Sequence, residues 1–436
     1  MNSLNDLLHT YIPGGCHTYS KGTDQYLNSE VPTAIESQGV WVVSSDNKRY
    51  LDWMMGNRVI CLGHGNKYVN KKVVRELSKG ANHSFPSLLE LNAARYFVDK
   101  IELGEMVKFG KNGSDAVSAA IRLSRAYTQK SKVIFCSDQP FYSIHDWFIG
   151  STASNAGVDL NTQSNLIKFK WNDISSLQKA IDSTHNDIAC LLLEVCKFDS
   201  PSNEFISYLN MIREKYGIII IADENINCMK FGIKGAYHYF NLNADLVCYG
   251  KAIANGFSFS LLAGPRRIME YGGSRARLPK VFLLSQTHSS ESVGISAAVA
   301  TCEYYLKNDV ESHIRKIGNM LKTKVNEVIA DTHLASKIYL GGLDQNPTWV
   351  TELDDPLDNL RLRSWLVKAM MDNNVLVNWF TISSEHKACH VSHTCKTLRK
   401  ILRKSSDSDY LSIPVKCLPK PVFRKYQHWQ ASHSEV

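Results

Sequence analysis

Four short, unbroken apolar runs recur along the middle of the chain: KVIFCS (132–137), IACLLLEV (188–195), IIIIADE (218–224) and LVCYG (246–250). Runs that do not alternate with polar residues are typical of strands buried on both faces. Helical patterns lie between them, as at 115–130 and 203–217. This alternation of strand and helix predicts an α/β fold with a mainly parallel sheet flanked by helices.

The two flanks of the chain have a different pattern. Residues 31–53 alternate apolar and polar positions and contain an Asp-Asn turn, which predicts an antiparallel hairpin. Further on, LRSWLVKAMMDNNVLV predicts a helix that runs into a strand. We therefore expect a small α+β domain built from both chain ends. The expected divisions are a large domain at 61–311, small-domain parts at 1–60 and 312–405, and a weakly patterned tail at 406–436.

Composition adds limits on partners and location. The chain has 436 residues, 44% of them hydrophobic, which is enough for a large core. Its net charge of +8 gathers toward the C-terminal end, where Leu398, Ile401 and Leu402 have helical spacing. We interpret the basic residues there as a solvated helix face and expect no nucleic-acid partner.

The eleven cysteines are scattered without a CxxC pair, so we expect free thiols, no metal site and a reducing compartment. The start of the chain has no secretory pattern, and no apolar stretch approaches the roughly 20 residues of a membrane helix. The expected location is the cytoplasm, without a membrane partner.

Residues that can carry chemistry follow several of these strands. Asp223 ends a buried strand, where open α/β sheets hold ligands, although a structural ion pair or helix cap would also suit it. Gly113 and Ser114 precede a helix whose free N–H groups would seat a phosphate, as would those of an ordinary capped helix. Tyr142 lies in an aromatic segment that would stack on a flat ring or fill a core. Lys251 follows LVCYG and alone would be a solvated charge.

One cofactor uses these features together. Pyridoxal 5'-phosphate needs a phosphate cradle, a stacking aromatic, a carboxylate beside its pyridinium nitrogen and a lysine that forms a Schiff base. The lysine must lose its proton to react, and burial near the cationic ring favours that loss.

The order and spacing of these motifs resemble the class III aminotransferases, which are fold type I pyridoxal-phosphate enzymes, and their glutamate-1-semialdehyde 2,1-aminomutase branch. IIIADENINCMKFG is similar to the family's strand ending Asp-Glu-Val, LVCYGKAIANG to its Schiff-base segment, and KNGSDAVSAAIRLSRAY to its phosphate loop. The resemblance implies that Asp223 pairs with the ring nitrogen and that Lys251 is the Schiff-base lysine. It also implies phosphate contacts from Gly113 and Ser114 and ring stacking by Tyr142.

Two further segments resemble the family less closely. FLLSQTHSSESVGISAA looks like the segment whose threonine reaches the neighbouring subunit's phosphate, which implies Thr287 and a homodimer with shared sites. PGGCHTYSKG is similar to the aminomutase opening and places Thr18 and Lys21 where the family's serine and arginine hold the substrate carboxylate. Lysine offers a point charge rather than a bidentate fork, and a solvated loop lysine is the alternative. Glu194 is a further candidate for substrate contact.

The chain departs from the family around the pocket. After Asp223-Glu224 the family usually has Val and then Thr-Gly-Phe-Arg, whereas this chain has Asn225, Asn227, Cys228, Met229 and Lys230. These changes prevent a transfer of substrate identity. We interpret the protein as an aminotransferase that moves an amino group between an amino-acid donor and a small carbonyl acceptor, sugar-derived ones included. A glutamate-1-semialdehyde-type aminomutase is the alternative, and a non-catalytic pyridoxal-phosphate-binding regulator is a more distant one.

Overall fold

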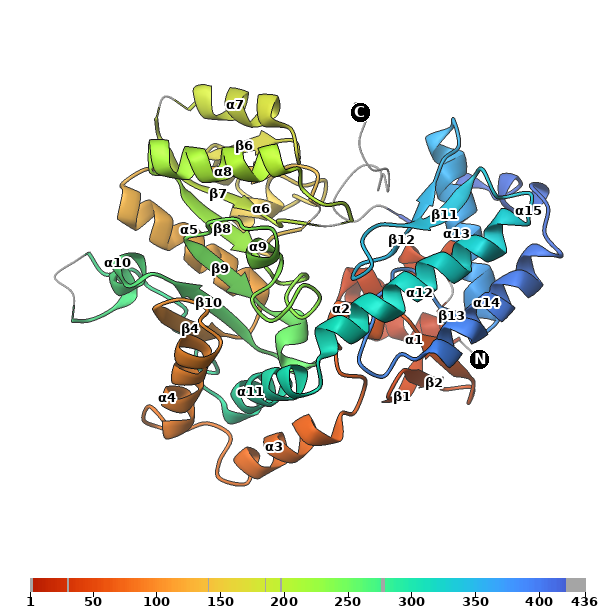
Figure 1. Cartoon of the computed structure of the whole chain (residues 1–436), viewed down its shortest axis with the longest axis horizontal. Helices are drawn as coiled ribbons and strands as arrows, with labels where there is room; N and C mark the ends of the chain where they lie inside the picture. The colour runs from red at the N-terminus through yellow and green to blue at the C-terminus, as the bar shows by residue number, and fades with distance from the viewer. Residues whose placement is uncertain are drawn as a thin grey trace. The chain divides into compact units, whose positions relative to one another are not determined.

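The computed structural model describes residues 3–29, 31–139, 141–184, 186–196, 198–275 and 279–420. The chain divides into two compact units (Figure 1). The larger unit is Lys67–Glu311, and the smaller combines residues up to Asn66 with those from Ser312 onward. Each has its own sheet and its own buried core.

The larger unit is built on a sheet that has, within the described residues, seven strands in the order β4-β10-β9-β8-β7-β5-β6. β10 is antiparallel to both neighbours, and the remaining adjacent pairs are parallel. The four apolar runs form β5, β7, β8 and β9, so the predicted mainly parallel sheet is confirmed. The strands are β4 (Met106–Gly110), β5 (Lys132–Cys136), β6 (Leu166–Phe169), β7 (Ile188–Leu193), β8 (Ile219–Asp223), β9 (Leu246–Tyr249) and β10 (Ser260–Gly264).

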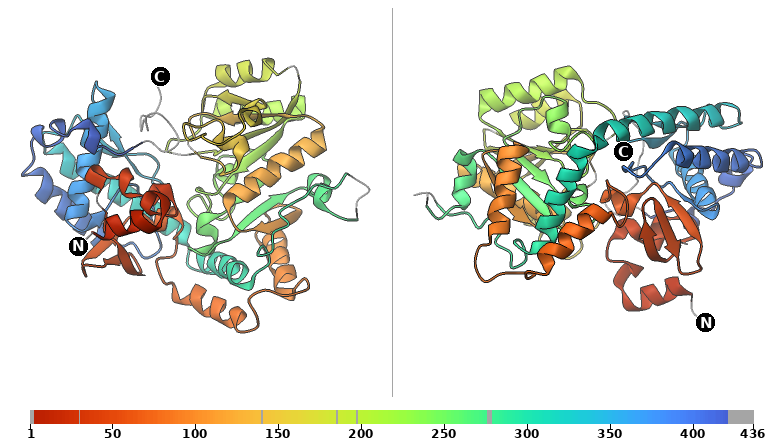
Figure 2. Two further views of the ribbon diagram at one scale, coloured as in Figure 1. Left: turned by 180° about the vertical axis from the view of Figure 1, so that it is seen from behind. Right: turned by 60° about the horizontal axis from the view of Figure 1, so that its bottom comes forward.

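Helices cover both faces of this sheet. The chain moves toward the β6 edge through α5 and returns through α8 and α9. Because crossovers between parallel strands are right-handed, the reversal places these helices on opposite faces. In Figure 1, α8 lies in front of the sheet. In the left view of Figure 2, which is seen from behind, α5 lies in front of it. The helices are α3 (Lys67–Leu77), α4 (Leu88–Arg95), α5 (Gly113–Thr128), α6 (Asp146–Ile149), α7 (Ile174–Asp182), α8 (Asn203–Tyr216), α9 (Ala236–Tyr239), α10 (Arg266–Met269) and α11 (Ser292–Lys307).

The smaller unit has, among the described residues, a sheet in the order β1-β2-β3-β13. The predicted hairpin at 31–53 is confirmed as antiparallel pairing of β1 with β2 and of β2 with β3. Asn47 takes the left-handed conformation (φ 60°) in the predicted turn, which asparagine tolerates. β13 pairs in parallel with β3, so both chain ends contribute to one sheet. The strands are β1 (Ala34–Gln38), β2 (Trp41–Ser44), β3 (Arg49–Asp52), β11 (Ile338–Gly341), β12 (Thr348–Thr351) and β13 (Val375–Leu376).

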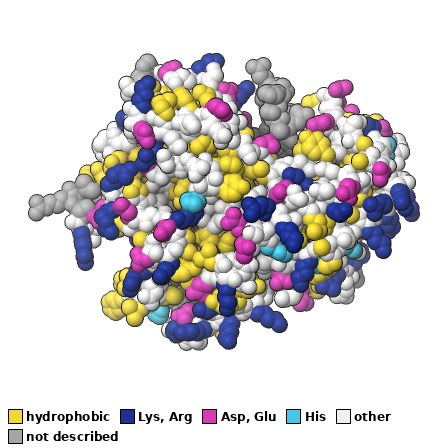
Figure 3. All heavy atoms as spheres, in the orientation of Figure 1, with side chains coloured by type: hydrophobic (Ala, Val, Ile, Leu, Met, Phe, Trp, Pro, Cys, Tyr) yellow, Lys and Arg dark blue, Asp and Glu magenta, His cyan; other side chains and the backbone are white. Residues whose placement is uncertain are grey.

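The C-terminal helical patterns of this unit are also confirmed. LRSWLVKAMMDNNVLV forms the end of α13 and all of β13. The helices are α1 (Leu4–Tyr11), α2 (Met55–Arg58), α12 (Val310–Ala330), α13 (Pro356–Asp372), α14 (Ala388–Leu402) and α15 (Ser408–Leu411). In α14, Leu398 and Leu402 are buried. Figure 3 shows Lys and Arg side chains gathered over α14, as expected of a solvated helix face.

The weakly patterned tail contains more order than its sequence suggested. α15 lies in it, and the backbone N–H of Lys420 donates to the carbonyl of Asp24 at 2.8 Å. The rest of the predicted tail, residues 421–436, lies outside the described residues. In the part of the chain that the structure describes, no helix has both the length and the apolar character that crossing a membrane requires.

We expect Leu191→Ala to destabilise the larger unit by about 2–5 kcal/mol, because Leu191 is fully buried in β7 and its removal leaves a cavity. Urea unfolding followed by tryptophan fluorescence would measure the shift in midpoint. Leu306→Ala on α11 is the matched control, since Leu306 is 60% exposed and should shift the midpoint little. Equal shifts for the two variants would contradict the assignment of β7 to the core.

Candidate active site

Three of the predicted site residues, two for the cofactor and one for the substrate, stand at the carboxyl ends of strands in the larger unit. Asp223 is the last residue of β8, Glu194 directly follows β7, and Lys251 follows β9 after one glycine. β8 pairs in parallel with both β7 and β9, so these three residues lie at one edge of the sheet. This is the edge where open α/β sheets hold ligands.

The carboxylate of Asp223 is buried, with only 3% of the residue exposed. Its Oδ1 accepts hydrogen bonds from the backbone N–H of Asn225 at 3.0 Å and from the Asn225 amide at 2.6 Å. Burial raises the pKa of Asp223 to about 7, and the charge of Glu194 adds to the rise. The Asn225 hydrogen bonds and the charge of Lys251 act in the opposite direction. A cationic ligand beside this carboxyl group would favour its ionised form.

Glu224, the second carboxylate of the motif, has a structural position. It is fully buried, and its two oxygens accept the backbone N–H groups of Ala236 and Tyr237 at 2.8 and 2.7 Å. These bonds fasten the start of α9 to the end of β8. Burial raises the pKa of Glu224 to about 8.

Lys251 has an unusual backbone conformation. Its φ of 47° is left-handed, which is uncommon for a residue with a Cβ. It begins a 3₁₀ turn, Lys251–Ala254, and its side chain is partly buried. Strained backbone of this kind concentrates at functional sites, where the surrounding structure enforces it. No sequence pattern indicated this strain.

The predicted phosphate loop begins α5. Gly113 and Ser114 are the first two residues of this helix, whose first-turn N–H groups and positive dipole end are suited to an anion. The Ser114 hydroxyl accepts the backbone N–H of Ile144 at 3.2 Å, which ties the loop to the segment after Tyr142. A Cβ on Gly113 would clash with Oδ1 of Asn225, so a larger residue there would displace the Asn225 side chain.

Tyr142 belongs to a buried aromatic cluster and is only 1% exposed. Its ring meets those of Phe135 and Phe148 edge to face, and its hydroxyl donates to Oε1 of Gln139. The same Gln139 oxygen accepts the backbone N–H of Glu194 at 2.8 Å. Gln139 thus joins the Tyr142 segment to the end of β7. Sequence reasoning missed Gln139, because a single glutamine in a loop has no periodicity that could single it out.

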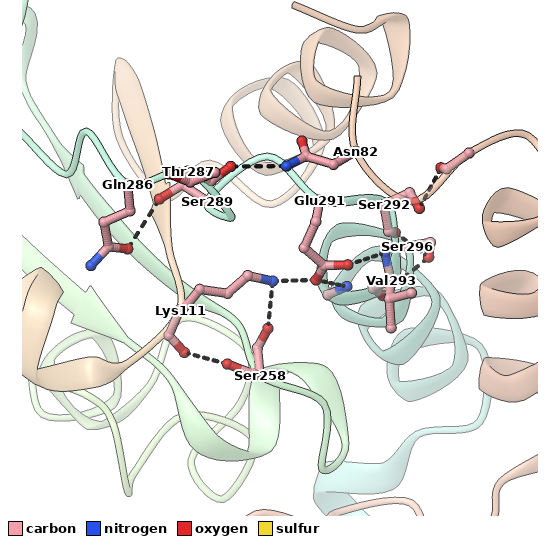
Figure 4. Close-up of polar contacts among 12 residues, drawn as sticks. Asn82, Lys111, Ser258, Gln286, Thr287, Ser289, Glu291, Ser292, Val293 and Ser296 are labelled. Carbon is pink, nitrogen blue, oxygen red and sulfur yellow. Dashed lines mark hydrogen bonds and ion pairs between the residues drawn. The ribbon is translucent and has the colours of Figure 1, made fainter. Parts of the chain in front are cut away.

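Thr287 lies in an exposed loop before α11, shown in Figure 4. Its carbonyl accepts a hydrogen bond from the side chain of Asn82 at 3.0 Å. Further along the same segment, Glu291 forms an ion pair with Lys111, and Lys111 also donates to the carbonyl of Ser258 at 3.1 Å. Because Lys111 precedes the phosphate loop, this pair fastens the Thr287 segment to it. Sequence reasoning missed both members, which lie far apart along the chain.

The two residues proposed to bind the substrate carboxylate belong to the smaller unit. Thr18 and Lys21 are both exposed, and Lys21 ends the 3₁₀ turn Tyr19–Lys21. Their part in substrate binding stays a prediction.

The side chains at the strand ends fit pyridoxal 5'-phosphate. Asp223 offers a buried anion to a cationic ring nitrogen, Lys251 an amine, and the start of α5 with Ser114 a seat for a phosphate. Among the described residues, Oε2 of Glu194 and Oδ1 of Asn225 are buried without a hydrogen-bond partner. Buried polar atoms normally have partners, so these two oxygens are suited to contacts with a bound ligand.

Comparisons with known proteins show the family to which the chain belongs. The family described as Aminotransferase class-III matches residues 26–343. A protein of Wigglesworthia glossinidia brevipalpis, named glutamate-1-semialdehyde 2,1-aminomutase, is 29% identical over 290 residues; the match covers 62% of this chain and 66% of that protein, just under two thirds of its length. A protein of the same name from Methanobrevibacter smithii is 26% identical over 361 residues, covering 79% of this chain and 83% of that protein.

Solved structures agree on the fold. The FumI protein of Sphingopyxis sp. MTA144, in its PLP internal aldimine form, superposes with a TM-score of 0.82 at 20% identity, covering 92% of this chain and 95% of that one. A glutamate-1-semialdehyde aminomutase of Pseudomonas aeruginosa PAO1 superposes with a TM-score of 0.79 at 18% identity, covering 92% and 93%. At these identities the likeness shows the fold alone.

The architecture is that of the fold type I pyridoxal-phosphate enzymes. The chain belongs to the class III aminotransferase family, whose members are pyridoxal-phosphate-dependent transaminases and aminomutases. The predictions of family, fold, enzyme class and cofactor are confirmed.

We expect the stability of the cofactor-free protein to fall as the pH rises through about 7, in part because of Asp223. An acid whose pKa is raised by folding stabilises the fold below its ordinary value, and that contribution is lost as the pH rises through the folded-state value. Asp223→Asn removes the contribution, so its thermal midpoint should fall less than that of wild type between about pH 5.5 and about pH 8.

Asp46→Asn is the control, because Asp46 is exposed and its pKa is lowered to about 2, outside this interval. The burial argument for Asp223 would fail if the Asp223→Asn and wild-type midpoints fell equally over the interval.

Proposed function

We propose that the protein is an aminotransferase that moves an amino group from an amino-acid donor to a small carbonyl acceptor, with pyridoxal 5'-phosphate held by Lys251. The observation that carries the proposal is the placement of Asp223 and Lys251 at the ends of the adjacent strands β8 and β9, beside the start of α5. A buried carboxylate, a lysine and a helix N-terminus are the groups that this cofactor requires.

Each residue has a distinct task in this proposal. Asp223 holds the proton on the ring nitrogen, Gly113 and Ser114 bind the phosphate, and Tyr142 lies against the ring. When bound, the cofactor supplies an electron sink for the carbon that loses a proton. The Nζ atom of Lys251 would take that proton from the substrate carbon and return it. The buried, unpaired Oε2 of Glu194 supports a contact with the substrate.

The choice of acceptor follows from the departures around the pocket. GKAIANGFSFSLLAG and HDWF are more typical of transaminases with unusual substrates, including sugar-derived and small-alcohol precursors. The lysine at position 21 supports the same choice, since it replaces the bidentate arginine of an aminomutase. The second candidate is a glutamate-1-semialdehyde-type 2,1-aminomutase, favoured by the names of the curated relatives and by the Pro-Gly-Gly opening.

We also propose a homodimer in which Thr287 of each subunit contacts the phosphate of the other. Large apolar side chains stand exposed on the segment that contains Asn82, which holds the Thr287 carbonyl. Phe85 is 82% exposed, Leu88 75% and Leu91 54%. Exposed apolar residues gathered in this way mark association surfaces, and a second copy would cover them. Among the described residues no cysteine belongs to a disulfide, which supports a location in the cytoplasm.

We expect Lys251→Ala to abolish amino transfer and the visible Schiff-base band of the cofactor-loaded protein, because the covalent link to the lysine is lost. Absorbance spectra and coupled keto-acid assays would measure both. Lys108→Ala, which removes an exposed lysine from β4, is the control and should behave as wild type. A visible band in Lys251→Ala that matches wild type would show that another lysine holds the cofactor.

A donor screen separates the two candidate reactions. For a transaminase, one amino acid should bleach the band and a keto acid should restore it, since the amino group leaves with a second substrate. For an aminomutase, glutamate 1-semialdehyde should be converted to its isomer without a second substrate. Mass spectrometry of the products with a ¹⁵N-labelled donor would decide between them.

The shared site predicts complementation between two defective chains. We expect Thr287→Ala to weaken cofactor binding about tenfold, through the loss of a hydrogen bond to the charged phosphate of the partner's site. If Thr287→Ala and Lys251→Ala chains exchange freely, about a quarter of all sites should regain both residues and bind as wild type. Cofactor titration of the mixture would detect this fraction. Its absence in exchanged dimers would show that Thr287 serves its own subunit or no site.

A further inference from the structure

Asn225 stands at the point where the candidate cofactor residues of three segments meet. Its amide donates to Oδ1 of Asp223, and only 6% of the residue is exposed. A Cβ on Gly113 would lie 2.1 Å from its Oδ1, and a Cβ on Gly250 would lie 2.3 Å from the same atom. The Asn225 side chain is thus fitted between the phosphate loop and the glycine that precedes Lys251.

The chemistry of this position differs from the valine that the resembling family usually has there. Valine would pack against the two glycines but has no N–H to offer. The Asn225 amide donates to a carboxylate oxygen, and such a bond favours the ionised form of the acid. Its Oδ1 has no donor among the described residues, as expected of a side chain that completes its hydrogen bonds only when a ligand fills the site.

We propose that Asn225 is a positioning residue that favours the ionised form of Asp223 and fixes its Oδ1, leaving the other oxygen for the ring nitrogen of the cofactor. The inference rests on the proposed function, in which Asp223 is the partner of that nitrogen. It goes further because it assigns the ionisation and orientation of the Asp223 carboxylate to a neutral amide. The resembling family usually has an apolar residue at this position.

Other charged and titratable groups also act on Asp223. Its pKa is raised chiefly by burial and next by Glu194, and Lys251 opposes them. The further titratable groups coupled to it are Glu224, Cys228, Cys248 and Tyr142. Asn225 carries no charge, so its replacement by an apolar residue leaves these interactions in place. The backbone N–H of residue 225 also still donates to Asp223, and only the side-chain hydrogen bond is removed.

The test compares full-length wild type with Asn225→Leu, which keeps the size of the side chain and removes the donor, and with Asn225→Val. Pyridoxal 5'-phosphate is titrated into the cofactor-free proteins by tryptophan fluorescence, and the visible band of the loaded proteins is titrated with acid. We expect Kd to rise roughly 10- to 100-fold on loss of a charge-assisted hydrogen bond. We expect the acid transition to move up by about one pH unit, because Asp223 then holds a proton more strongly.

Asn227→Leu is the matched control. Asn227 is fully buried two residues along, and its amide donates to the carbonyl of Cys196 rather than to Asp223. This variant loses a buried amide and should keep the wild-type acid transition. Thermal midpoints of the cofactor-free proteins report whether each variant folds.

The inference is overturned if either Asn225 variant, folded with a midpoint near that of wild type, keeps both the Kd and the acid transition of wild type. It is also overturned if Asn227→Leu moves the transition as far as Asn225→Leu does. If wild type itself forms no visible band that depends on Lys251, the proposed function fails first and this inference fails with it. A wild-type band with unchanged Asn225 variants refutes the inference alone.

Discussion

The burial of the Asp223 carboxylate is the constraint on which the candidate site depends. A carboxylate that is 3% exposed at the end of a fully buried strand is costly unless hydrogen bonds and an opposite charge compensate it. The chain supplies two N–H donors from Asn225, and the charge of Lys251 acts from the end of the next strand. A bound cation would further compensate the negative charge of Asp223, and a protonated pyridine ring is such a cation. Structure and cofactor chemistry therefore agree at this carboxylate.

The rest of the larger unit holds this edge of the sheet in place. Glu224 fastens the start of α9 to β8, and Gln139 joins the end of β7 to the Tyr142 segment. The Lys111–Glu291 pair fastens the Thr287 segment to the phosphate loop. Each of these contacts joins residues that stand apart along the chain, so the strand ends are kept in register by polar side chains as well as by the apolar core.

Family membership indicates the type of reaction, but it leaves the identity of the substrate open. The groups that pyridoxal phosphate requires are kept, whereas the positions after Asp223-Glu224 and Tyr142 differ from the resembling family. Substrate choice resides in such pocket positions, because a few contacts decide which transition state is stabilised. The aminomutase name of the curated relatives at 25–29% identity is compatible with a different amino-group acceptor here.

The sequence by itself determined the parallel sheet and the antiparallel hairpin of the N-terminal flank, and it singled out Asp223, Lys251, Gly113 and Ser114 as candidate site residues. Unbroken apolar runs, period-two alternation and strand-end motifs are local signals, and local signals can be read along a chain. Only the tertiary structure showed the left-handed backbone of Lys251, the bridging position of Gln139, the Lys111–Glu291 pair and the fit of Asn225 between Gly113 and Gly250. These features arise from contacts between strands and loops distant in sequence, and no periodicity encodes which of them meet.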